Sequence, residues 1–104
     1  MKEFNYIRNW AKFRGIYEKG DSKTQCLKLQ EEVGELSKAI LDKDKNEVID
    51  AIGDCVVVLT NLAELASIEF NDYMPIEECI KIAFEEIKDR KGKIVDGTFV
   101  KDNE

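Results

Sequence analysis

Hydrophobic residues near the start of the chain recur at intervals of three to five, close to the repeat of an α-helix. This pattern predicts a first helix over about residues 2–17. Gly15 weakens that helix and Gly20 ends it, because glycine disfavours the helical conformation. The residues on its apolar face are Phe4, Ile7, Ala11 and Ile16.

A second helix is predicted from its cap and its apolar stripe. Asp21 or Ser22 can accept hydrogen bonds from the first free N–H groups, and the helical pattern continues to about residue 41. A polar connection over residues 42–45 follows. The stripe has alternating spacings of three and four and comprises Cys26, Leu29, Val33, Leu36 and Ile40.

The third predicted helix, over about residues 46–68, is apolar on nearly every side. Such a pattern is typical of a helix buried at the centre of a domain. The β-branched run over residues 55–59 is also compatible with a strand. Helical spacing continues on both sides of this run, so we prefer a helix.

The last third of the chain predicts one more helix and a small hairpin. Pro75 suits a first helical turn and Gly92 a helix end. The pair Asp96-Gly97 lies between short apolar runs, which indicates a tight β-turn. We therefore expect one all-α domain over residues 1–104, a four-helix bundle with a short C-terminal hairpin-like tail. The apolar face of the fourth helix comprises Ile76, Cys79, Ile80, Ala83, Phe84 and Ile87.

Net charge and the absence of histidine narrow the chemistry. The 16 basic and 22 acidic residues give a formal net charge of −6, which disfavours general nucleic-acid binding. The chain has no histidine, which excludes Ser-His-Asp and Cys-His nucleophilic systems and His-containing metal sites. Acid–base or metal chemistry must come from carboxylate, lysine, tyrosine or cysteine side chains.

The cysteines and the lack of a leader indicate the compartment. Cys26, Cys55 and Cys79 match no Cys-x-x-Cys spacing, and we expect Cys55 and Cys79 in the core. A sparse, odd cysteine count and the absence of a leader peptide predict a cytoplasmic protein. The longest unbroken apolar stretch, residues 55–59, is too short to cross a bilayer, so we expect no membrane partner.

Carboxylates form two stripes beside apolar helix faces. Glu32 and Glu35 lie one turn apart on the second helix. Glu47, Asp50 and Asp54 share a face of the otherwise apolar third helix. If the stripes face each other, their oxygens surround one cavity, and carboxylate oxygens are the ligands that Mg²⁺ or Mn²⁺ prefers. The alternative is a salt-bridged or solvated face, although no basic residue lies between Lys45 and Lys81.

These motifs resemble those of the MazG-like nucleotide pyrophosphohydrolases, the all-α NTP pyrophosphatase superfamily. The resemblance rests on residues 29–36 and 50–54, and the chain is most similar to small stand-alone or phage-type members. The family pattern pairs Glu-x-x-Glu with Glu-x-x-Asp. Glu32 and Glu35 match the first half. For the second half, Glu47 with Asp50 matches literally, whereas Asp54 matches the position before the apolar run, so both pairings stay open.

The resemblance implies a Mg²⁺-dependent hydrolysis of nucleoside triphosphates to monophosphates and pyrophosphate. It implies that Glu32, Glu35, Asp50, Asp54 and Glu47 hold the metal, and that Glu35 or Glu32 orients the attacking water. It also implies a homodimer or homotetramer. Mn²⁺ is an alternative metal.

Substrate-binding candidates each have a plain structural alternative. Lys28 and the cations Arg90, Lys91 and Lys93 are candidates for binding phosphate, or they are ordinary surface charges. Trp10 is a candidate for stacking on a base, or it is a partly buried aromatic residue. Asn61 is a candidate for reading a base edge, and as a buried polar residue it needs a partner in any case.

Two other functions compete with the enzyme. A non-catalytic helical interaction module would use the apolar third helix as an oligomer interface and leave the carboxylates solvated. An acidic regulator or nucleic-acid mimic would spread its acidic residues over an outer face, whereas the distinctive ones here lie among apolar neighbours.

Overall fold

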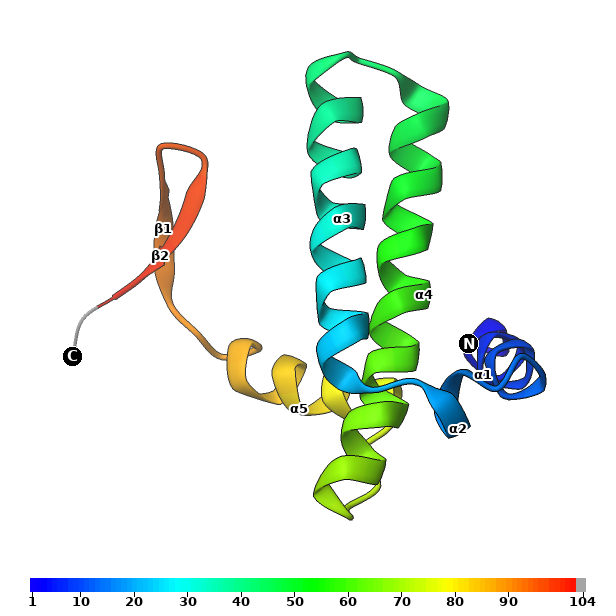
Figure 1. Ribbon diagram of the computed structural model, residues 1–104. Coiled ribbons are helices and arrows are strands. Elements are labelled where there is room, and N and C mark those ends of the chain that lie inside the picture. Colours follow the sequence, from blue (N-terminus) through cyan, green and yellow to red (C-terminus); the bar gives the residue numbers. More distant parts are fainter. Residues whose placement is uncertain (103–104) are drawn as a thin grey trace.

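The computed structural model describes residues 1–102 as an all-α domain that ends in a two-stranded hairpin, which confirms the predicted fold class (Figure 1). In the view of Figure 1, α3 and α4 form a long antiparallel pair, α1 lies on one side of it and α5 leads away on the other. The elements are α1 (Glu3–Phe13), α2 (Ile16–Lys19), α3 (Ser22–Leu41), α4 (Lys45–Phe70), α5 (Ile76–Ile87), β1 (Gly92–Val95) and β2 (Thr98–Lys101).

The first predicted helix is broken in two. α1 ends at Phe13, and Gly15 adopts a left-handed conformation with φ of 76° before the single turn of α2 begins. Glycine reaches this conformation without steric cost, so the chain turns here rather than continuing as one helix. The prediction of a continuous helix over residues 2–17 is therefore wrong.

The second and third predicted helices are confirmed, with their caps. Asp21 accepts a hydrogen bond from the N–H of Thr24 at 2.8 Å, and α3 follows to Leu41. Asp44 accepts one from the N–H of Glu47 at 3.2 Å at the start of α4. Residues 55–59 are helical, so the strand alternative is wrong.

The core lies mainly between α3 and α4 and is small. Leu65 is 2% exposed and Val58 is 6% exposed, while α1 contributes the fully buried Ala11. Ala39 on α3 and Ala51 on α4 are also buried, and small side chains allow two helices to approach closely. The close pairing of α3 and α4 is what brings their carboxylates together.

The prediction that the third helix is buried on all sides is wrong for the single chain. One side of α4 packs against α3, but an apolar stripe on another side remains exposed. By length and composition α4 could also cross a membrane, although Asp54 and Glu64 lie within it and it packs against α1, α3 and α5. The exposed stripe, called here the α4 stripe, comprises Ile49, Ile52, Val56 and Leu59.

The C-terminal region has the predicted elements but little of the predicted burial. Pro75 precedes α5, which ends at Ile87 rather than near Gly92. None of its residues is fully buried, and Phe84 is 56% exposed, so the predicted core face of this helix is uncovered in the single chain. Cys79 is exposed and Cys55 half-buried, which corrects their predicted place in the core.

The predicted hairpin is confirmed. β1 and β2 pair antiparallel, with Lys93 opposite Val100 and Ile94 opposite Phe99. Asp96 and Gly97 both have positive φ, 50° and 80°, which is the signature of the tight turn that matches the twist of two strands. Every residue of both strands is exposed.

An ion pair ties the first helix to the last. Arg8 on α1 donates two hydrogen bonds to the carboxylate of Glu77 on α5, at 2.8 Å and 2.6 Å. The Arg8 guanidinium lowers the pKa of Glu77 to about 2. This two-pronged contact holds α5 beside α1 where hydrophobic burial is slight.

Candidate metal centre and substrate pocket

Four of the predicted carboxylates influence one another across the α3–α4 pair. Repulsion from Glu32, followed by burial and with a smaller contribution from Asp54, raises the pKa of Glu35. Burial, followed by repulsion from Asp50 and then Glu32, raises the pKa of Asp54. The structure thus brings together Glu32 and Glu35 of α3 with Asp50 and Asp54 of α4, and we call these residues the carboxylate cluster.

Glu32 is the buried member of the carboxylate cluster. Its side chain is only 8% exposed, and its Oε1 lies 3.3 Å from the Lys28 ammonium. Its Oε2 is buried and has no hydrogen-bond partner among the described residues. A buried carboxylate oxygen without a partner is costly, so this atom is suited to receive a cation or a donor from outside the chain.

The cluster fits a hard divalent cation by its donors. Its ligands would all be carboxylate oxygens, which suits Mg²⁺ or Mn²⁺, and Glu32 Oε2 is an oxygen left free for coordination. Within residues 1–102, no three acidic or cysteine side chains converge closely enough to form a ready metal site. Mutual repulsion keeps like charges apart, and a cation between them would remove that repulsion.

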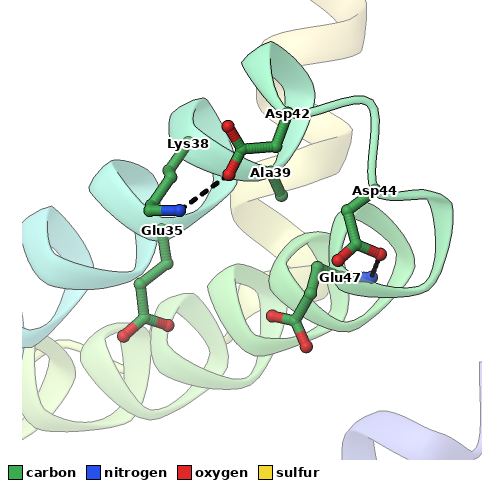
Figure 2. Close-up of a pocket in the computed structure, with 6 residues that line it drawn as sticks. All are labelled: Glu35, Lys38, Ala39, Asp42, Asp44 and Glu47. Carbon is green, nitrogen blue, oxygen red and sulfur yellow. Dashed lines mark hydrogen bonds and ion pairs between the residues drawn. The ribbon is translucent and has the colours of Figure 1, made fainter.

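Glu47 lies at a different place from Asp50 and Asp54. It lines a pocket of about 280 Å³ beside the turn between α3 and α4 (Figure 2). Figure 2 shows the carboxylates of Glu35 and Glu47 projecting to the same side, so Glu35 belongs both to this pocket and to the carboxylate cluster. The other residues lining the pocket are Lys38, Ala39, Asp42 and Asp44.

Trp10 adjoins the carboxylate cluster through a second pocket. This pocket has a volume of about 440 Å³, and Asp54 forms part of its otherwise largely apolar lining. Trp10 is 47% exposed, with the Arg14 guanidinium 4.2 Å from its ring centre. An accessible aromatic ring beside a carboxylate cluster is a surface on which a planar base can stack. The remaining residues of this aromatic pocket are Tyr6, Ile7 and Val57.

Asn61 has a partner within the chain. Its side chain is buried, and its Oδ1 accepts a hydrogen bond from the Tyr17 hydroxyl at 2.6 Å. Burial raises the pKa of Tyr17 to about 12, so this hydroxyl remains a donor. The contact joins α2 to α4. Asn61 therefore has a partner inside the chain, which is the structural role that we set against reading a base edge.

The predicted phosphate-binding cations lie in two places. Lys28 contacts Glu32 directly, beside the carboxylate cluster. Arg90 and Lys91 line a pocket between the end of α5 and the hairpin, and Lys93 lies on β1. Figure 1 shows this hairpin standing apart from the α3–α4 pair of its own chain.

Sequence reasoning missed three residues near these pockets. Tyr6 lies one turn before Trp10 and lines the same pocket, so their spacing was an available signal. Tyr17, which bonds Asn61, carried no signal of its own. Glu64 lies three residues after Asn61, and burial raises its pKa while its Oε2 has no partner among residues 1–102. It lines a separate pocket with Tyr17 and Tyr73.

The protein is an all-α domain in which two antiparallel helices, α3 and α4, carry carboxylates that influence one another. Comparison with protein families assigns it further: the model of the MazG nucleotide pyrophosphohydrolase domain matches residues 21–95. The chain therefore belongs to the MazG nucleotide pyrophosphohydrolase family. The matched region contains α3, α4 and α5, and with them the whole carboxylate cluster.

A curated relative comes from a bacteriophage. The chain is 38% identical over 58 residues to the uncharacterized 18.2 kDa protein in the rep-hol intergenic region of Haemophilus phage HP1. The match covers 56% of this chain and 36% of the phage protein, so the chain matches about a third of that relative. No solved structure shows a significant match.

Proposed function

We propose that this protein is a Mg²⁺-dependent nucleoside triphosphate pyrophosphohydrolase that releases a nucleoside monophosphate and pyrophosphate. The observation that supports the proposal is the carboxylate cluster, in which four carboxylates of α3 and α4 influence one another and the buried Oε2 of Glu32 has no hydrogen-bond partner among residues 1–102. Family membership supports the reaction class. Mn²⁺ is the alternative metal because it accepts the same oxygen ligands.

The four carboxylates have different surroundings and therefore different proposed roles. Glu32, Asp50 and Asp54 would hold the metal, and the Lys28 ammonium contacts Oε1 of Glu32 at 3.3 Å. Glu35 is exposed to solvent at the edge of the cluster, so it would orient the attacking water and accept its proton. The bound Mg²⁺ would supply charge neutralisation for the triphosphate. The water oxygen bonds to phosphorus as the α–β bridge breaks, and pyrophosphate leaves.

The aromatic pocket is the proposed place for the base. Trp10 offers an accessible ring, and Asp54 links the pocket to the carboxylate cluster. A nucleotide could therefore place its base on Trp10 and its phosphates at the cluster. Replacing Trp10 by alanine should raise KM more than it lowers kcat, because stacking acts on substrate and transition state alike.

We also propose that the protein is a cytoplasmic homodimer or homotetramer. The α4 stripe exposes four large apolar side chains in a row, and α5 exposes another apolar face. Adjacent apolar surface of this kind is typical of an interface between subunits. Three unpaired cysteines suit a reducing compartment.

Product analysis tests the proposed reaction. The protein would be incubated with Mg²⁺ and a panel of ribo- and deoxyribonucleoside triphosphates, and the products would be separated. We expect monophosphate and pyrophosphate, and a loss of roughly 100- to 10,000-fold in kcat for Glu35→Gln, as for removal of a general base. Glu31→Gln, an exposed neighbour on the same helix, should retain activity. Formation of diphosphate and phosphate would contradict the proposal.

The competing function is a non-catalytic interaction module. The exposed apolar faces of α4 and α5 would be the interface that such a module uses. It predicts no turnover of any nucleotide and no increase in melting temperature when Mg²⁺ and nucleotide are added. If the protein is instead the proposed enzyme, we expect the melting temperature to rise, because ligands that bind the native state stabilise it.

A further inference from the structure

Positive charge is concentrated at the C-terminal end of this acidic protein. Residues 88–101 contain five basic and two acidic residues, which gives the segment a net charge of +3 in a chain of net charge −6. Lys88 is paired with Glu85 at 2.6 Å. The other four cations form no ion pair with any residue of the described structure, and they are Arg90, Lys91, Lys93 and Lys101.

Within residues 1–102, the hairpin that carries these cations packs closely against no helix. Each of its two faces combines apolar and basic side chains: Val95, Val100 and Lys93 on one, Ile94, Phe99 and Lys101 on the other. Ile94 is 68% exposed. An isolated two-stranded hairpin is marginally stable in water, so this one is expected to pack against another surface.

The carboxylate cluster lacks the opposite charge. Four carboxylates lie close together there. Within residues 1–102, the one cation paired with a member of the cluster is Lys28, which contacts Glu32. A triphosphate adds several further negative charges. Bound divalent metal offsets part of this charge, and phosphate oxygens beyond the metal need basic side chains.

The hairpin does not supply those cations to the cluster of its own chain. α5 packs against α4 and is held at Glu77 by Arg8, and from there the chain leads away from the α3–α4 pair (Figure 1). The basic hairpin and the acidic cluster of one chain are therefore complementary in charge but apart in space. In two copies of the chain, the basic hairpin of one can meet the acidic cluster of the other.

We propose that the hairpin of one copy docks on a second copy and places Arg90 and Lys93 at the triphosphate bound to that copy's carboxylate cluster. This inference rests on the proposed function for the identity of the ligand. The docking itself rests on charge complementarity and on the uncovered apolar side chains of the hairpin. Each active site would then combine carboxylates from one subunit with cations from another.

Complementation between two inactive variants tests this arrangement. One variant is Glu35→Gln, with an intact hairpin. The other carries Arg90→Ala and Lys93→Ala with an intact cluster, and we expect its turnover to fall at least about 10-fold, because each lost contact to a charged phosphate weakens binding. The two variants would be unfolded together and refolded as a mixture.

If the hairpin acts on the second copy, mixed dimers regain one complete site. Random mixing of two subunit types then restores about a quarter of the unmodified activity, since half the dimers are mixed and each has one of two sites complete. A mixture of Glu35→Gln with Glu32→Gln is the matched control, because both changes damage the same cluster and cannot complement. Recovery no greater than in this control would overturn the proposal.

Cross-linking tests the docking without relying on turnover. With Cys26, Cys55 and Cys79 changed to serine, Lys93→Cys in one chain and Lys28→Cys in a longer, tagged chain would be joined by a short bismaleimide. We expect a product with the summed mass of the two chains. Lys23→Cys, an exposed lysine elsewhere on the same helix, is the control and should give little product.

The two experiments separate the docking from the proposed function. If the unmodified protein turns over no nucleotide but the Lys93–Lys28 cross-link forms, the function fails and the docking stands. If the protein is active but the chains carrying Lys93→Cys and Lys28→Cys are linked no more than in the Lys23→Cys control, the docking is wrong and the function stands.

Discussion

The α3–α4 pair and the region from α5 onward both carry apolar faces, but these faces have very different surroundings. The pair buries Leu65, Val58 and part of the carboxylate cluster. By contrast, α5 and the hairpin bury no residue fully. An apolar face therefore predicts that a helix or strand forms. It does not predict what covers that face, which depends on neighbouring elements. In our proposal a second copy of the chain is one of these neighbours.

Alanine substitutions in the two regions should have unequal effects on stability. Leu65→Ala removes a side chain that is 2% exposed, so the free energy of unfolding should fall by about 2–5 kcal/mol. Phe84→Ala on α5 should cost about 0.5 kcal/mol in the monomer, because the ring is 56% exposed. Urea unfolding at several protein concentrations measures both.

The concentration dependence makes this test sharper. If a second copy covers α5, the effect of Phe84→Ala should grow as protein concentration rises, while that of Leu65→Ala on the monomer should not. Equal effects of the two substitutions at low concentration would show that α5 is packed within the monomer, which would remove the contrast between the two regions.

Removing the hairpin should separate folding from activity. A chain that ends after Lys88 keeps every helix and every buried residue of the α3–α4 pair. We expect a far-ultraviolet circular-dichroism spectrum and a melting temperature close to those of the full chain. Turnover should fall roughly 100-fold, because two cationic contacts to phosphate are lost. Undiminished turnover would show that the hairpin takes no part in catalysis.

The Arg8–Glu77 pair should give a small pH-dependent contribution where the two regions meet. Arg8 lowers the pKa of Glu77 from 4.5 to about 2, so its stabilisation is complete above pH 4.5 and is lost as pH falls towards 2. The Glu77 side chain is 44% exposed, so solvent screening limits this contribution to about 1 kcal/mol or less. The stability difference between unmodified protein and Glu77→Gln should be largest at neutral pH.

That difference should shrink steadily between pH 4.5 and 2, while Arg8 stays charged throughout. A matched substitution, Glu78→Gln, removes an exposed carboxylate from the same turn of α5 without touching Arg8. A difference for Glu77→Gln that stays constant over this range would show that the pair is not formed in solution.

Much of the fold could be predicted because local rules fix it. Asp21 caps α3 through Thr24, and Asp96 with Gly97 forms the hairpin turn, as their residue types indicate. The break at Gly15 could not be predicted with the same certainty. Glycine tolerates both helical and left-handed conformations, and packing of α1 and α2 against α4 decides between them.

The candidate site could be predicted as a set but not in detail. Helical spacing alone placed Glu32 and Glu35 on one face and Asp50 and Asp54 on another. Whether Glu47 joins them depends on the register of α3 against α4, which the turn and the buried alanines set. In the structure Glu47 lies at the turn pocket and Asp54 at the aromatic pocket, so we favour Asp50 and Asp54 as the second pair.

Titration with Mn²⁺ followed by electron paramagnetic resonance tests the central claim most directly, because it reports on the carboxylate cluster whatever the substrate. We predict that the unmodified protein and Glu31→Gln bind Mn²⁺, and that Asp54→Asn, which keeps the shape of the side chain, binds it much more weakly. No binding by the unmodified protein, or equal binding by Asp54→Asn, would contradict the assignment of these helices as a metal-dependent catalytic centre.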